Sequence, residues 1–173
     1  MSDLFTQLDL FPQGQESVTL AQARAMLREK MKGGVDCPCC GRLVKDYKFT
    51  ILGTMAATLM WIVSKAKQTK ETWVHLNNPE APAWIKADRN YPRLAYWDLA
   101  MPKEQTDKEE KRCSGYWRPT PVGIDFVYNR VRVPKYILAY NNIPFEQSEE
   151  TVSIKDALKK RFNYEEMMRT WML

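Results

Sequence analysis

The chain has 173 residues, a hydrophobic content of 45% and a formal net charge of +5. This length suits one domain with a tail, and the composition is that of a globular chain. The start lacks a basic segment before an apolar run, and the most apolar stretch, residues 51–63, is too short for a bilayer. We therefore expect a cytoplasmic protein with neither signal peptide nor membrane partner. The modest positive charge permits contact with nucleic acid without requiring it.

Residues 1–17 are predicted to form a flexible tail, because small and polar residues follow Pro12 and little anchors the segment. This tail contains an apolar pair beside a polar amide, in the run Gln7, Leu8, Asp9, Leu10 and Phe11. A local turn would let the two adjacent large side chains fill one pocket. The amide would then donate and accept hydrogen bonds while the carboxylate faces water.

The same five residues resemble the short motif by which bacterial polymerases, repair proteins and some phage proteins bind the replicative sliding clamp. The usual form of the motif is Gln-Leu-Ser/Asp-Leu-Phe, which this segment matches at every position. The resemblance implies that the bacterial DNA polymerase sliding clamp is a partner. The alternative is that these apolar residues pack back on the domain as a short helix or strand.

A helix is predicted after Thr19, because Thr19 and Gln22 have the spacing of a capping box. Apolar residues at 20, 23 and 27 then follow at helical spacing, and Gly33-Gly34 would end the helix. This pattern predicts a helix that faces a core.

The next feature is a tight turn, Cys37-Pro-Cys-Cys-Gly41, in which Cys37 and Cys40 have the spacing of a zinc knuckle. A structural zinc site takes four ligands, and further candidates are Cys39, His75 and Cys113. The sequence thus leaves zinc as a possible cofactor. The alternatives are a knuckle held by packing and hydrogen bonds alone, and a purely structural role for His75.

The remaining pattern predicts an α+β fold. We expect a strand over 43–49, a central helix over 51–67 capped by Thr50, a strand over 73–76, a short helix over 82–87 and a helix over 90–99. A polar loop over 103–112, a strand over 115–118 and a helix from Thr120-Pro121 to about residue 130 follow. A strand over 134–140, a turn at Asn141-Asn142 and a mostly helical segment over 152–173 complete the chain.

Two helices, a charged loop, a strand and a Thr-Pro-x-Gly helix in this order resemble a winged-helix domain, so we predict one winged-helix-like domain over 18–173. The recognition helix would turn Leu94, Trp97 and Leu99 to the core. The candidate contacts to double-stranded DNA are Arg89, Arg93, Tyr96, Lys108, Lys111 and Arg112. Acidic residues share the loop, which also fits a solvated loop, and winged helices serve as protein-interaction modules too.

No catalytic set is recognisable in the sequence. The single histidine lies in an aromatic strand, no glycine-rich phosphate loop is present, and Asp88, Asp98 and Asp125 are too dispersed for a metal-nuclease cluster. We therefore predict that the protein is not an enzyme.

A wider resemblance joins the cysteine turn to several later segments, namely 96–99, 115–118, 133–135 and 152–158. Together they resemble a family of small, largely uncharacterised bacteriophage proteins. The resemblance implies phage origin and a bacterial host cell, without an assigned activity. The leading hypothesis is a clamp-binding protein that interferes with host DNA replication. The alternatives are a winged-helix DNA-binding regulator and a clamp-recruited DNA-processing factor.

Overall fold

The computed structural model describes residues 18–103, 115–159 and 161–172 and mixes helices with short antiparallel strands. The mixed α+β class predicted from the sequence is therefore confirmed. The chain groups into two compact units, Met1–Tyr47 (unit 1) and Lys48–Leu173 (unit 2), which are described separately. Residues 1–17, and with them the predicted tail, lie outside the described residues.

The described part of unit 1, residues 18–47, consists of one helix and one hairpin. Helix α1, Leu20–Lys30, has the predicted capping box: the Gln22 backbone N–H donates to the Thr19 hydroxyl, and the Thr19 N–H donates to the Gln22 side chain. Strands β1, Val35–Asp36, and β2, Leu43–Val44, pair antiparallel. The Met31 carbonyl at the end of α1 accepts a hydrogen bond from the Asp46 N–H, which ties the helix to the hairpin.

The core-facing stripe predicted for this first helix is wrong. Ala23 is the one buried residue of α1, and Leu20 is 59% exposed. The short hairpin offers little apolar surface for the helix to cover, since Val44 is the one buried residue of its two strands.

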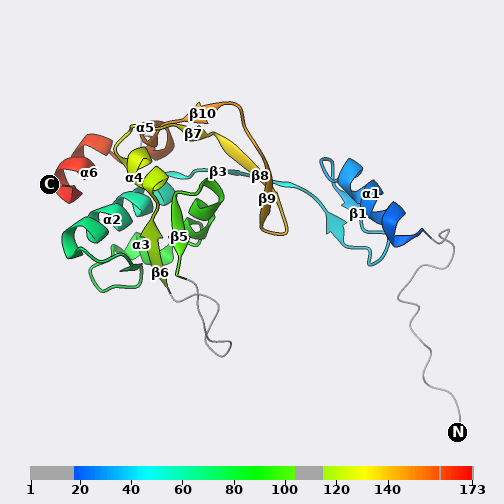
Figure 1. Cartoon of the computed structure of the whole chain (residues 1–173), viewed down its shortest axis with the longest axis horizontal. Helices are drawn as coiled ribbons and strands as arrows, with labels where there is room; N and C mark the ends of the chain where they lie inside the picture. The colour runs from blue at the N-terminus through cyan, green and yellow to red at the C-terminus, as the bar shows by residue number, and fades with distance from the viewer. Residues whose placement is uncertain (1–17, 104–114, 160, 173) are drawn as a thin grey trace, which may run out of the picture. The chain divides into compact units, whose positions relative to one another are not determined.

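Unit 2 is built around α2, Gly53–Thr69, whose residues 55–64 are all buried. This confirms the predicted central helix, which packs against η1, α4, α5, α6 and β6 (Figure 1). The predicted cap is wrong. Thr50 ends strand β3, Tyr47–Thr50, and the helix begins after Leu52 without a side-chain cap.

A three-stranded antiparallel sheet follows, in the order β4-β6-β5. It comprises β4, Val74–His75, β5, Ala100–Pro102, and β6, Tyr116–Pro119. Between β4 and β5 lie the helix α3, Ala83–Ala87, and the 3₁₀ helix η1, Tyr91–Trp97. The strands predicted over 73–76 and 115–118 and the short helix predicted over 82–87 are confirmed, whereas β5 was not predicted. The helix predicted over 90–99 is present as a 3₁₀ helix, with Pro92 in its first turn.

The C-terminal part alternates short helices and strands. Helix α4, Pro121–Val127, has the predicted Thr120 cap and is followed by β7, Val133–Pro134, β8, Tyr136–Tyr140, and β9, Ile143–Gln147. Asn141 and Asn142 form the predicted hairpin turn, with φ values of 49° and 63°. Strand β10, Thr151–Val152, pairs with β7, and a second three-stranded sheet has the order β3-β8-β9.

Two further predictions need correction. The strand expected over 43–49 is divided between β2 and β3, which lie in different sheets. The segment expected to be mostly helical over 152–173 starts in β10 and continues as α5, Ile154–Leu158, and α6, Tyr164–Trp171. Its first helix ends where Lys159 takes a positive φ of 55°, and Asn163 caps the second.

Within the described part of the chain, no helix combines the length and the apolar character that a membrane crossing needs.

Candidate functional site

Several candidate residues lie outside the described residues. These are the clamp-motif residues Gln7, Leu8, Asp9, Leu10 and Phe11, the loop cations Lys108, Lys111 and Arg112, and Cys113. The structure therefore describes two candidate regions, the surroundings of η1 in unit 2 and the cysteine turn in unit 1.

The 3₁₀ helix η1 is fixed to the core by its apolar face. Leu94 and Leu99 are fully buried, and the Trp97 indole N–H donates to the Pro134 carbonyl at 2.7 Å. The predicted core-facing side of this helix is thus confirmed. Asp98 closes the helix in a left-handed conformation with φ 52°, which turns the chain into β5.

The predicted nucleic-acid contacts on η1 have partners inside unit 2. The Arg93 guanidinium lies 4.5 Å from the centre of the Phe49 ring and donates to the Asn90 side chain. The Tyr96 ring also contacts Phe49, with centroids 5.6 Å apart, and its hydroxyl bonds to the Asn142 amide oxygen at 3.3 Å.

Arg93 and Tyr96 are consequently half-buried, whereas Arg89, just before the helix, is exposed. The sequence analysis missed Phe49 and Asn142 as partners of this face. No local signal reveals them, because they come from β3 and from the β8–β9 turn, more than 40 positions away along the chain.

The Thr-Pro-x-Gly segment holds the start of α4 against the end of η1. The Thr120 hydroxyl donates to the Asp98 carbonyl and accepts a hydrogen bond from the Gly123 N–H. A Cβ atom at Gly123 would lie 1.9 Å from the Leu99 carbonyl oxygen. The glycine is therefore required by a close approach of two backbones.

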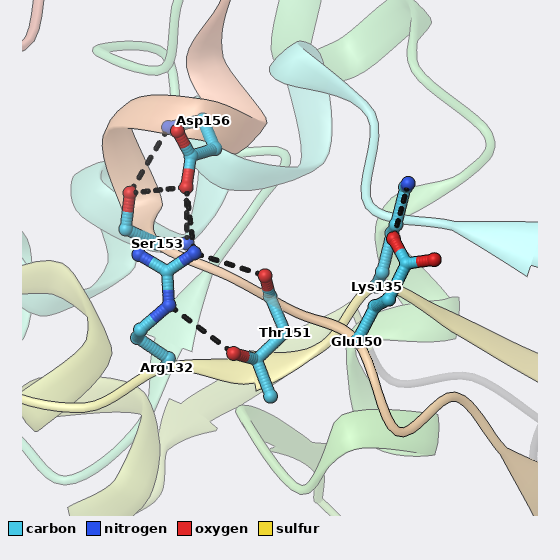
Figure 2. A network of polar contacts seen from close by, with 6 residues as sticks. All are labelled: Arg132, Lys135, Glu150, Thr151, Ser153 and Asp156. Atoms are coloured by element: carbon cyan, nitrogen blue, oxygen red, sulfur yellow. Dashed lines mark hydrogen bonds and ion pairs between the residues drawn. The ribbon is translucent and has the colours of Figure 1, made fainter.

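Figure 2 shows a polar network that connects β7, β10 and α5. The Arg132 guanidinium donates to the Thr151 carbonyl at 2.9 Å and pairs with Asp156 at 3.2 Å. Asp156 also accepts hydrogen bonds from the Ser153 N–H and hydroxyl, and these bonds, followed by Arg132, hold the pKa of its carboxyl below the usual value. Lys135 and Glu150 form an ion pair beside this network. All hydrogen-bond and ion-pair partners in this network belong to unit 2, so we assign the network a structural role.

The cysteine turn in unit 1 is closed by backbone hydrogen bonds. The Cys37 N–H donates to the Arg42 carbonyl at 2.8 Å, and the Gly41 N–H donates to the Cys37 carbonyl at 2.8 Å. Gly41 has a φ of 67°, which favours glycine. The backbone N–H groups of Cys39 and Cys40 donate to the Cys37 sulfur and lower the pKa of its thiol. Cys37, Cys39 and Cys40 are all free of disulfides.

The other candidate ligands lie apart. In the ranges that the structure describes, no three His, Cys, Asp or Glu side chains gather as a metal would need. The His75 ring contacts the Tyr116 ring in a tilted arrangement, with centroids 4.6 Å apart. Asp88 accepts two hydrogen bonds from Asn90, and Asp125 pairs with Arg130 at 3.3 Å. Each of these groups has a structural contact of its own.

Comparison of the chain with protein-family models, with curated proteins and with solved structures finds no match.

Proposed function

We propose that the protein binds the bacterial DNA polymerase sliding clamp through residues 7–11 and interferes with host DNA replication. The observation that carries the proposal is the segment Gln-Leu-Asp-Leu-Phe, which matches the clamp-binding motif at every position. Leu10 and Phe11 would fill an apolar pocket of the clamp, and the Gln7 amide would supply hydrogen bonds at its rim.

This binding mode explains how a small protein would act on replication. Polymerases, the clamp loader and repair factors use the same pocket of the clamp, so an occupied pocket excludes them. Residues 12–19 separate the motif from α1 and can span at most about 29 Å. Unit 1 would thus be held close to the clamp surface, where a second contact would raise the avidity.

Calorimetry with purified clamp tests the proposal. Replacing Leu10 and Phe11 together by Ala should weaken binding at least about 100-fold, since each buried apolar anchor contributes on the order of 2 kcal/mol or more. Asp9→Ala is the matched control, because a side chain that faces water contributes little. Equal affinity of the double variant and the parent would remove the motif assignment.

Primer extension then tests interference. The full chain should slow synthesis by polymerase with the clamp and leave synthesis without the clamp unchanged. A peptide covering residues 1–17 should compete in the same way at higher concentration. Inhibition of the same size without the clamp would point to direct action on DNA or polymerase, and binding without inhibition would favour recruitment.

A second candidate function is contact with double-stranded DNA by a winged-helix region. The order α2-β4-α3-η1-β5-β6 and the sheet order β4-β6-β5 support it, since they combine two consecutive helices with a three-stranded sheet. The polar segment predicted to form the wing falls between β5 and β6 in the sequence. With Arg93 and Tyr96 engaged by Phe49 and Asn142, the cations for this role are Arg89 and the loop residues Lys108, Lys111 and Arg112.

Fluorescence anisotropy with a short DNA duplex at low salt tests this second role. Arg89→Glu and the triple Lys108/Lys111/Arg112→Glu variant should weaken binding and reduce its salt dependence, because each lost phosphate contact lowers the slope by about one. Arg24→Glu, on the exposed side of α1, makes the same charge change at another place. Undetectable binding at low salt would leave the region as a protein-interaction module.

A further inference from the structure

The cysteine turn has the geometry of one half of a metal site. The β1–β2 hairpin closes it, with the Cys37 N–H bonded to the Arg42 carbonyl and the Gly41 N–H bonded to the Cys37 carbonyl. The Cys40 N–H also donates to the Cys37 carbonyl at 3.3 Å. The closed turn thus holds two cysteines three positions apart, which is the spacing of zinc ligands.

The described part of unit 1 buries few side chains. Over residues 18–47 the buried side chains are Ala23 and Val44, while Leu20 and Leu43 are 59% and 63% exposed. Cys37, Cys39 and Cys40 form no disulfide. A metal bound at the turn would therefore contribute directly to the stability of this segment.

The described residues of one chain do not complete a ligand set. Structural zinc takes four ligands, and the described residues gather no set of three. A second copy of the chain offers an identical pair of thiolates, and a twofold axis through the metal would arrange the two pairs tetrahedrally. The exposed Leu43, in the strand that follows the turn, would gain cover in such an arrangement.

We propose that two copies of the chain share one Zn²⁺ through Cys37 and Cys40 of each copy, so that unit 1 is a zinc-dependent dimerisation module. Four thiolates around Zn²⁺ leave a net charge of −2. Residues 18–47 carry six basic against three acidic side chains, with Arg42 directly after the turn, and this surplus balances the charge. The inference is independent of clamp binding.

The test uses the reduced full-length protein with added Zn²⁺ and measures its mass by light scattering and its metal content by elemental analysis. We expect a dimer with about one Zn²⁺ per two chains, and a monomer after chelation. Co²⁺ in place of Zn²⁺ should give the absorption of a tetrahedral tetrathiolate site. A monomer that holds one Zn²⁺, or a chain that binds none, would overturn the proposal.

Variants identify the ligands. Cys37→Ser and Cys40→Ser should each abolish zinc binding and dimerisation, whereas Cys39→Ser, Cys113→Ser and His75→Ala should retain both. Loss of zinc in any variant of the second group would show that another side chain is a ligand and would contradict the proposal. All six tryptophans belong to unit 2, so an unchanged tryptophan fluorescence spectrum shows that a variant keeps that unit folded.

Discussion

Unit 1 and unit 2 differ in how well they bury their apolar side chains. In unit 2 one continuous hydrophobic cluster runs from Ile51 to Met172 around α2. Among residues 18–47 of unit 1, Ala23 and Val44 are the buried side chains. Each unit contains regular secondary structure, and side-chain caps are present on α1 in unit 1 and on α4, α5 and α6 in unit 2. Secondary structure therefore forms in unit 1 although few of its described side chains are buried. We expect the global stability to reside in unit 2 and unit 1 to depend on its ligands and partners.

The positions of the tryptophans allow the two units to be followed separately. All tryptophans lie in unit 2, at positions 61, 73, 84, 97, 117 and 171. Urea unfolding followed by tryptophan fluorescence therefore reports on unit 2, and hydrogen exchange of the backbone amides reports on each unit separately.

The largest effect is expected from Gly123→Ala in unit 2. The new Cβ would collide with the Leu99 carbonyl oxygen, so two backbone segments must separate, at a loss of about 3 kcal/mol or more in the free energy of unfolding. The matched change in unit 1 is Gly33→Ala, where the nearest atom is 4.0 Å from the Cβ position. Amide exchange in unit 1 should show no change for Gly33→Ala, and a urea curve of Gly123→Ala that equals the parent's would contradict the close approach.

A leucine pair compares the two units directly. Leu59 is fully buried in α2, and Leu59→Ala should lower the free energy of unfolding by about 3 kcal/mol through lost burial and a cavity. Leu20→Ala removes the same atoms from an exposed position of α1, and amide exchange in that helix should show a loss of less than about 0.5 kcal/mol. Equal losses would mean that α1 is packed as tightly as α2.

Capping residues should have intermediate effects that stay within their own unit. Ser153→Ala removes the cap of α5 and should lower the free energy of unfolding of unit 2 by about 1 kcal/mol. Thr19→Ala removes the equivalent cap of α1, which should speed amide exchange in that helix and leave the tryptophan-detected transition in place. A shift of that transition by Thr19→Ala would show that the units unfold together.

The pH dependence of unit 2 should contain a contribution from Asp156. Its pKa is lowered in the folded protein by the Ser153 N–H and hydroxyl, and then by Arg132, so the stabilisation is complete above the unfolded pKa of about 4. It is lost as the pH falls through the lower folded pKa. Asp156→Asn should therefore be less stable than the parent at pH 7, with a smaller difference near pH 3, as measured by urea unfolding at the two pH values. A constant difference would exclude the carboxylate as the titrating group.

The smallest effect is expected at the surface of η1. Arg93→Ala removes the contact with Phe49 and should lower the free energy of unfolding by about 0.5–1 kcal/mol. Arg89→Ala changes an exposed side chain and should be neutral within about 0.5 kcal/mol. If urea unfolding ranked the two arginines in the opposite order, the guanidinium would not rest on the ring in solution.

The sequence by itself determined the features that depend on neighbours a few positions apart. The Thr19 capping box, the Thr120 cap with its following proline, and the Asn141-Asn142 turn all rest on hydrogen bonds or backbone angles within a few residues. The central position of α2 was also predictable, because apolar residues surround most of the helix.

Only the tertiary structure decided which surfaces are covered, because burial depends on segments that are distant in sequence. The apolar stripe of α1 stays largely exposed since the short hairpin cannot cover it. Arg93 and Tyr96 are held by Phe49 and Asn142 instead of facing outward, and Thr50 completes a strand instead of capping a helix. A helix cap depends on residues three positions apart in the sequence. The residue that a side chain contacts in the folded protein depends on the packing of the whole unit.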